Sequence, residues 1–462
     1  MSADWQEVRL EDITSILGDG IHGTPKYEEK GEYSFINGNN LSNGKIIIDE
    51  KTKRASKEEY LKYKKNLNDR TILVSINGTI GNIGLYNGEK VFLGKSACYF
   101  NVLEDVDKQF IRYVVTSKYF QNYINSLATG STIKNVSLKL MRDFTFRLPP
   151  LEIQKQISKV LEDLDDKIQL NRQINQTLEQ TAQAIFKSWF VDFEPVKAKI
   201  EAKENGQDPE RSAMRAISGK SDEELDQLPR EQFDQIKATA VLFPDEMVET
   251  ELGEIPSGWV WSTIGNEVDV VGGGTPSTKN GVFWDSGTYH WTTPKDLSGL
   301  ADKILLSTER KLTEAGIGQI SSGLLPVDTV LLSSRAPVGY LVLSKIPTAI
   351  NQGFIAMKCN RRLKPEFVLQ WTASVMDEIK QRSSGSTFAE ISKTNFRLIN
   401  VLVPSKELVD DYVRIAKIIY EKITESALES SSLSEMRDSL LPKLLSGEIT
   451  LSNTHRMAEA DA

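Results

Sequence analysis

Residues that could perform chemistry occur in two glycine-rich motifs of the 462-residue chain. Gly94-Lys95-Ser96 resembles the end of a phosphate-binding loop, but the preceding glycine, Gly88, lies one residue too far away. Gly272-Gly273-Gly274 follows an apolar run at 268–271, yet no helical segment and no suitably placed acidic residue complete a dinucleotide-binding fingerprint. Both motifs are therefore interpreted as turns.

Other catalytic patterns are missing from the sequence. No Asn-Pro-Pro-aromatic or Asp-Pro-Pro-aromatic tetrapeptide, which holds an adenine for amino methylation, occurs in the chain. The three histidines are too scattered for a catalytic triad, and two cysteines cannot form a zinc ribbon or a disulfide framework. We expect a non-catalytic protein without a metal site, and the alternative is a stand-alone nuclease or methyltransferase.

Length and composition predict a multidomain globular protein. A chain of 462 residues predicts about two to four domains, and 39% hydrophobic with 26% charged residues is an ordinary globular composition. The N-terminus has no basic start before an apolar run, and no uncharged apolar run of about 18 residues occurs. We therefore expect a soluble, cytoplasmic protein that makes no membrane contact.

The net charge of −8 is distributed unevenly. Residues 1–150 and 257–404 each carry a net charge of +3, whereas residues 151–195, 196–256 and 405–462 carry −3, −7 and −4. The acidity therefore lies in the connecting segments, and two mildly basic globular blocks remain. Such mild basicity permits nucleic-acid binding but does not diagnose it.

The sequence contains an internal duplication with an offset of about 251–258 residues. Each copy places a tryptophan, Trp5 or Trp259, before an alternating run, and each then contains a Gly-Thr-Pro turn, at 23–25 or 274–276. Three landmark pairs follow in the same order: Ser75 to Gly81 with Ser333 to Gly339, Gly130-Ser131-Thr132 with Gly385-Ser386-Thr387, and Pro149 with Pro404. The sequence therefore predicts two similar domains.

Two helices of about 35–40 residues are predicted after Pro149 and Pro404, because the apolar spacing there changes from alternation to a heptad. Their core positions are Ile157, Leu161, Leu164, Ile168, Asn171, Asn175, Leu178, Ala182 and Ile185, and Val409, Tyr412, Ala416, Ile419, Ile423, Ser426, Ser430, Leu433, Arg437, Leu440 and Leu444. We predict that the two helices pair with each other. Burial of each helix against its own domain is the alternative.

Three further segments are interpreted from their composition. The aromatic residues at 186–193 form either a local core or a docking patch, and the acidic residues 197–256 are predicted to be a partly ordered surface connector. A basic cluster is interpreted as a solvated helical face, with phosphate contact as the alternative: Lys51, Lys53, Arg54, Lys57, Lys62, Lys64 and Lys65.

Five segments carry a resemblance to a known family. They are LPPLEIQKQISKVLEDLDDKIQLNRQINQTLEQTAQAIFKSWFVDFEPV, GEIPSGW, GGGTPS, HWTTPKDL and RDSLLPKLLSGEI, in this order. Together they resemble the DNA-specificity subunit (S subunit) of type I restriction–modification enzymes, over nearly the whole chain from Trp5 to about Ile449.

The resemblance implies an α+β fold in which two similar mixed α/β target-recognition domains are separated by two long antiparallel helices, a coiled coil, in a pseudo-two-fold duplication. The implied divisions are target-recognition domain 1 (1–150), conserved helix 1 (151–195), an acidic connector (196–256), target-recognition domain 2 (257–404), conserved helix 2 (405–450) and a tail (451–462). Each recognition domain would bind one half of a split DNA target, with half-sites about one helical turn (~34 Å) apart.

The resemblance also implies partners. These are double-stranded DNA, two modification methyltransferase subunits that methylate adenines, and restriction subunits with translocase and nuclease activity. S-adenosylmethionine, ATP and Mg²⁺ would belong to those partners, so no cofactor is expected in this chain. The alternative is a scaffold of the same fold that docks proteins without recognising DNA.

Candidates for DNA contact are polar residues on predicted turns, because their side chains can bond bases and phosphates. They are Thr24, Lys26, Asn39, Asn40, Asn77, Lys95, Ser131 and Lys134 in the first copy, and Thr275, Ser277, Lys279, Thr293, Lys295, Ser334, Arg335, Asn351, Gln352 and Ser386 in the second. An exposed turn without DNA contact is the alternative for each. Asn77 and Arg335 differ between the copies and are the better candidates for specificity.

Candidates for docking protein partners lie near the ends of the two helices. They are Phe186, Trp189, Phe190 and Phe193 on the first helix, and Leu440, Leu441 and Leu444 on the second. Packing of these side chains against each other is the alternative.

Overall fold

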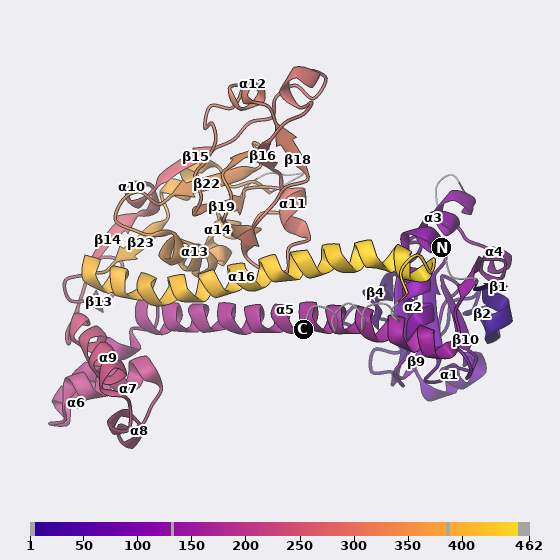
Figure 1. Ribbon diagram of the computed structural model, residues 1–462. Coiled ribbons are helices and arrows are strands. Elements are labelled where there is room, and N and C mark those ends of the chain that lie inside the picture. Colours follow the sequence, from indigo (N-terminus) through magenta and orange to yellow (C-terminus); the bar gives the residue numbers. More distant parts are fainter. Residues whose placement is uncertain (1–4, 131–133, 385–388, 451–462) are drawn as a thin grey trace, which may run out of the picture. The chain divides into compact units, whose positions relative to one another are not determined.

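The computed structural model describes residues 5–130, 134–384 and 389–450 (Figure 1). The chain forms two compact units, the first containing Met1–Ile168 and Ser432–Ala462 and the second Gln169–Ser431. Each of the two long helices therefore begins in one unit and ends in the other. In the described ranges, no helix has the length and apolar character needed to cross a membrane.

The first unit contains a four-stranded antiparallel sheet of order β2-β10-β7-β8 and a three-stranded sheet of order β6-β3-β9. Its strands are β1 (Gln6–Arg9), β2 (Thr14–Asp19), β3 (Tyr33–Ile36), β4 (Leu41–Ser42), β5 (Lys45–Ile46), β6 (Arg54–Ala55), β7 (Thr71–Ser75), β8 (Ile83–Leu85), β9 (Val91–Leu93), β10 (Ala97–Val102) and β11 (Thr145–Leu148). Its short helices are α1 (Lys57–Tyr63), α2 (Lys108–Thr116), α3 (Lys118–Leu127) and α4 (Leu138–Arg142). The central strands β7 and β10 are buried along their whole length, which explains their continuous apolar sequences.

The second unit contains a five-stranded sheet of order β15-β22-β19-β20-β17 and a three-stranded sheet of order β18-β16-β21. Its strands are β14 (Val260–Thr263), β15 (Asp269–Gly272), β16 (Tyr289–Thr292), β17 (Ile304–Leu305), β18 (Arg310–Leu312), β19 (Thr329–Ser333), β20 (Leu341–Ser344), β21 (Thr348–Ile350), β22 (Phe354–Lys358) and β23 (Asn400–Val403). Its short helices are α10 (Ile264–Glu267), α11 (Pro294–Ser298), α12 (Glu314–Ile317), α13 (Pro365–Ser374), α14 (Met376–Gln381) and α15 (Lys393–Arg397).

The two units repeat the same strand pairings. β2, β10, β7 and β8 pair in the same order as β15, β22, β19 and β20, and β3 pairs with β9 in parallel as β16 pairs with β21. In each unit the first strand pairs antiparallel with the last, β1 with β11 and β14 with β23. The duplication predicted from the landmarks is therefore present in the fold.

The two long helices, α5 (Leu151–Phe190) and α16 (Lys406–Leu445), run antiparallel inside each unit. In the second unit the Asn171 side chain of α5 donates a hydrogen bond to the carbonyl of Ser426 in α16. One turn later along α5, the Asn175 side chain donates to the carbonyl of Ile423, which lies three residues before Ser426, so the two helices run in opposite directions. The predicted heptad positions that are buried include Ile157, Leu161, Ile168, Ala182, Tyr412, Ala416 and Ile423. The predicted pairing of the helices, and with it the predicted fold class, is confirmed.

The acidic connector is more ordered than expected. It forms α6 (Glu194–Glu204), α7 (Pro209–Ser218), α8 (Asp222–Asp226), α9 (Arg230–Leu242) and a hairpin of β12 (Met247–Val248) and β13 (Ile255–Pro256). Asp208 caps α7 and Ser221 caps α8, while Met214 and Leu225 are buried in a small core of their own. The expectation of a partly ordered segment is therefore wrong, because its acidic residues cover helices with an apolar side.

The basic cluster is only partly helical. Lys57 and Lys62 lie on α1, as expected, but Arg54 lies on β6, where it pairs with Ser34, and Lys53 directly precedes that strand. The helical interpretation is therefore wrong for the residues before Lys57 and for Lys64 and Lys65, which follow the end of α1 at Tyr63.

Candidate functional site

In the first unit, the loops at 21–26, 36–40, 76–78, 93–96 and 134–136 are joined by backbone hydrogen bonds. The bonds run from Ile21 N to Leu93 O (2.8 Å), Gly94 N to Ile36 O (2.9 Å), Ile76 N to Ser96 O (2.9 Å), Val136 N to Ile76 O (2.8 Å) and Gly78 N to Lys134 O (3.1 Å). Because each loop is bonded to another, they form one group, here named the first loop cluster.

The second unit repeats this network with its loops at 272–277, 292–296, 333–336, 350–353 and 390–391, here named the second loop cluster. The bonds run from Gly274 N to Ile350 O (3.0 Å), Asn351 N to Thr292 O (3.1 Å), Ser334 N to Gly353 O (2.8 Å) and Ile391 N to Ser334 O (3.1 Å). The Ser75 hydroxyl accepts the amide of Asn82, and the Ser333 hydroxyl likewise accepts that of Tyr340. The predicted correspondence of Ser75–Gly81 with Ser333–Gly339 is therefore confirmed.

Two glycines allow the close approach of these loops. A Cβ atom on Gly20 would lie 2.0 Å from the Leu93 carbonyl oxygen, and one on Gly273 would lie 1.9 Å from that of Ile350. No residue with a side chain fits at such a distance, so both positions require glycine. Backbone packing thus explains Gly273 of the triple glycine, while Gly272 is the last residue of β15 and the turn interpretation holds only for the residues after it.

The candidate residues of the first loop cluster divide into exposed and hydrogen-bonded side chains. Thr24, Lys26, Asn39, Lys95 and Lys134 are exposed. Asn40 instead accepts the amide of Asn37 (3.0 Å) and donates to the Ile47 carbonyl, and the Asn77 amide donates to Asn135 (3.2 Å). The exposed lysines are therefore better placed for phosphate contact than Asn40, whose amide holds its own turn.

More candidates of the second loop cluster are held by hydrogen bonds or ion pairs to neighbouring residues. Thr275 donates to Gln352 (2.5 Å), Thr293 donates to Asp296 at the start of α11, and Lys295 pairs with Glu309 (2.7 Å). Arg335 lies 3.7 Å from Glu390, and Asn351 accepts the amide of Gly353. Ser277 and Lys279 are exposed.

One candidate has to be corrected, and two lie outside the described residues. Ser334 is only 3% exposed, so its hydroxyl is not available to a base edge and its prediction as a DNA contact is wrong. Its place in the network is structural, since its backbone links two loops. Ser131 and Ser386, in the Gly-Ser-Thr segments, lie outside the described residues.

Sequence reasoning missed Arg310 as a candidate, and it missed that Arg310 and Lys53 of the basic cluster each stack on an aromatic ring beside these clusters. The Lys53 ammonium lies 4.6 Å from the centre of the Tyr27 ring, and the Arg310 guanidinium lies 3.6 Å from that of Trp284. Aligning the two copies through the Gly-Thr-Pro turn would not have found this pair, because that offset of 251 residues places Lys53 opposite Ile304.

The aromatic docking candidates of the first helix are core residues. Phe186, Trp189 and Phe190 are buried, and Phe190 contacts Phe367 and Tyr412, with ring centroids 5.0 and 5.2 Å away. Their prediction as an exposed docking patch is therefore wrong, and the alternative of a local core is correct. Phe193, which is half-buried against Trp259, retains a partly accessible ring.

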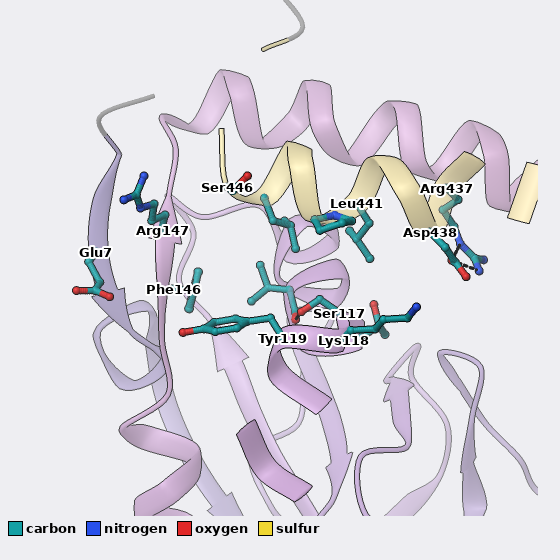
Figure 2. Close-up of a pocket in the computed structure, with 14 residues that line it drawn as sticks. Glu7, Ser117, Lys118, Tyr119, Phe146, Arg147, Arg437, Asp438, Leu441 and Ser446 are labelled. Carbon is teal, nitrogen blue, oxygen red and sulfur yellow. Dashed lines mark hydrogen bonds and ion pairs between the residues drawn. The ribbon is translucent and has the colours of Figure 1, made fainter. Parts of the chain in front are cut away.

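The first unit contains an apolar pocket of about 650 Å³ that is lined by one of the three leucine candidates of the second helix (Figure 2). Leu441 lines it from α16, and Figure 2 shows Tyr119 and Phe146 across the pocket from that leucine. Leu440 is half-buried near it, whereas Leu444 is buried in the core of the unit and is not available for docking. Leu441 is thus the docking candidate with the most suitable surroundings.

One carboxylate of α5 connects the sheet-containing domain of the first unit to α16. Asp165 accepts from Arg112 (2.5 Å) and Tyr113 (2.8 Å) of α2, and from Arg437 (2.8 Å) of α16. Burial raises the pKa of Tyr113, so its hydroxyl remains a donor. These four side chains, the Asp165 cluster, attach the domain to both helices.

Another carboxylate of α5 has the same role in the second unit. Glu179 accepts from Lys303 (2.7 Å), Gln370 (3.0 Å) of α13 and Tyr420 (2.9 Å) of α16. Burial raises the pKa of Tyr420 well above its usual value, which keeps its hydroxyl protonated and donating. The sheet-containing domain of each unit is therefore fixed to the helices by buried or half-buried polar contacts.

The described residues give little support for metal binding or for a reactive thiol. Within the described ranges no group of three or more histidine, cysteine or acidic side chains is arranged to hold a metal ion. Burial raises the pKa of the Cys98 thiol, so that thiol stays protonated and unreactive.

Comparison with known proteins points to one family. The family described as type I restriction modification DNA specificity domain matches residues 2–180 and 256–434. The type I restriction enzyme HindI specificity subunit of Haemophilus influenzae is 33% identical over 348 residues, which cover 72% of this chain and 75% of that protein. The MjaIX specificity subunit of Methanocaldococcus jannaschii is 35% identical over 164 residues, 35% of this chain and 38% of its own length.

A solved structure shares the fold. The crystal structure of the type I restriction–modification S subunit from M. genitalium superposes with a TM-score of 0.51, covers 96% of both chains and is 18% identical. At that identity the likeness concerns the fold alone.

Proposed function

Because this chain belongs to the family of type I restriction–modification DNA specificity subunits, we propose that it selects the DNA sequence on which such a complex acts. Each recognition domain binds one half of a bipartite target through its own loop cluster. The helices α5 and α16 act as the spacer that sets the distance between the two half-sites, about one helical turn or a multiple of it.

The observation that carries this proposal is the repetition of the loop cluster. Two copies of one hydrogen-bonded scaffold present different side chains at equivalent positions, such as Asn77 in the first copy and Arg335 in the second. A shared scaffold with different side chains is suited to binding two different half-sequences in the same way. The net charge of +3 on each of residues 1–150 and 257–404 favours approach to the phosphate backbone.

The proposal includes protein partners. Two modification methyltransferase subunits and restriction subunits dock on this chain, in the cytoplasm, and supply S-adenosylmethionine, ATP and Mg²⁺ chemistry that this chain does not perform. The pocket beside Leu441 supports one such contact, because it is apolar and bordered by the charged residues Lys118 and Arg437.

The test compares adenine methylation in cells that make this chain with its modification subunit and in cells that make the modification subunit alone. We expect a split motif, with a methylated adenine in each half, only when this chain is present. Identical methylation in both kinds of cell would contradict DNA selection and favour the scaffold alternative.

A further inference from the structure

The two stacked cations occupy equivalent positions in the two recognition domains. In the first unit the Phe35 amide donates to the Lys53 carbonyl (2.8 Å), and Ser34 pairs with Arg54. In the second unit Trp291 pairs with Arg310 and His290 with Lys311. Since β3 and β16 are the equivalent central strands of the small sheets, Lys53 corresponds to Arg310, and Arg54 to Lys311.

The aromatic partners come from the segment that follows the Gly-Thr-Pro turn in each unit. Tyr27 lies two residues after Pro25, and the Trp284 indole donates to the carbonyl of Ser277 (3.0 Å), just after the second turn. The Trp291 indole donates to the Gly274 carbonyl (3.1 Å), and its ring lies 5.4 Å from Arg310. Each stacked cation therefore lies next to its loop cluster.

The electrostatic surroundings leave both cations available to a ligand. Lys53 and Arg310 are exposed, and among the described residues neither has an acidic side chain at ion-pair distance, unlike Lys295 and Arg335. Stacking on a ring fixes the direction of a cation while its N–H donors stay free at the edge. An oriented, uncompensated cation on a basic domain is suited to an anionic or acceptor-rich ligand.

We propose that these stacked cations are DNA-contacting residues and that the difference between them helps to give the two halves of the target different sequences. Arg310 presents a planar fork, which matches two acceptors on the edge of one guanine in the second half-site. Lys53 presents a single flexible charge, which matches a phosphate in the first half-site. This inference rests on the proposed function of the chain.

The test measures the methylated motif and the rate of methylation with the intact complex carrying Arg310→Ala, Arg310→Lys or Lys53→Ala. The matched controls are Lys311→Ala and Arg54→Ala, which each remove one exposed charge from the next position in the chain. Thermal unfolding of each variant identifies any that fail to fold.

For Arg310→Ala we expect methylation to fall about 10-fold to 100-fold on the native target and to lose selectivity at one position of the second half. Arg310→Lys keeps the charge, so it should retain most binding and lose the same selectivity. Lys53→Ala should weaken DNA binding about equally on all sequences and reduce the slope of log affinity against log salt by about 1. The control variants should leave the motif unchanged.

The inference is overturned if Arg310→Ala and Arg310→Lys both keep the wild-type motif and methylate at the rate of Lys311→Ala. It is also overturned for Lys53 if Lys53→Ala binds DNA as tightly as the wild-type chain. In both cases a bipartite motif made by the wild-type chain would still support the proposed function. A wild-type chain that directs no motif would contradict the proposed function itself.

Discussion

Replacing Trp189 with alanine lowers the free energy of unfolding of the second unit by about 4 kcal/mol. The Trp189 side chain is 1% exposed and lies at the end of α5, where its ring contacts those of Phe243 and Tyr412. Phe243 comes from the connector and Tyr412 from α16, so the truncation opens a cavity where three segments meet. The loss is large because a rigid core cannot collapse fully around a missing indole.

Denaturant unfolding of the purified chain measures this loss. The matched control is Val191→Ala, two residues further along, whose side chain is 46% exposed and whose truncation should change stability by less than about 0.5 kcal/mol. If Trp189→Ala unfolds at the wild-type midpoint but no longer joins the complex, Trp189 is a docking residue and its assignment to the core is wrong.

Replacing Asp165 with asparagine lowers the stability of the first unit by about 2–3 kcal/mol. The Asp165 side chain is 20% exposed and accepts hydrogen bonds from two arginines and a tyrosine. Asparagine keeps the shape but removes the negative charge, so the half-buried Arg112 loses its partner carboxylate and Arg437 keeps only its pair with Asp438. Asp165 also connects α2 to α16, so its loss should loosen the domain on the helices.

A double-mutant cycle with Arg437→Met isolates the contribution of the pair, measured by denaturant unfolding. We expect the second substitution to cost less in the presence of the first, since the ion pair between Arg437 and Asp165 is then already lost. The control is Asp163→Asn, an exposed carboxylate of the same helix (56%) paired with Lys159, which should cost less than about 0.5 kcal/mol. Equal losses for Asp163→Asn and Asp165→Asn would contradict a special role for Asp165.

The long helices could be predicted because their apolar residues recur at a regular local spacing. The duplication could be predicted because its landmarks occur twice in the same order. Heptad positions such as Ile157 and Ile423 recur every three or four residues, and burial follows that spacing directly. The paired landmarks, such as Ser75 and Ser333, carry the same loop conformation because the same hydroxyl caps it in both copies.

The core at the end of α5 could not be predicted, because it depends on contacts distant in sequence. Phe190 packs on Phe367, which lies in another part of the chain, and Trp189 packs on Phe243 at the end of the connector. The acidic composition of that connector concealed its apolar residues. The overall composition of such a segment reflects the residues on its exposed surface, and it does not show which apolar residues pack together.

The loops of the candidate site were found from the sequence, but the state of their side chains was not. Whether Lys295 is free depends on Glu309, 14 residues away, and the burial of Ser334 depends on how two loops meet. The stacking of Arg310 on Trp284 depends on the pairing of β18 with β16. Such contacts form only when distant segments of the chain fold together, so the local sequence does not predict them.

The most direct test of target selection by two separate domains is the exchange of residues 1–150 for the corresponding segment of a relative that directs a different motif, followed by methylation mapping. We predict that one half of the motif becomes that of the donor, while the other half stays unchanged. A motif that remains the same in both halves, or that changes in both, would contradict the assignment of one half-site to each domain.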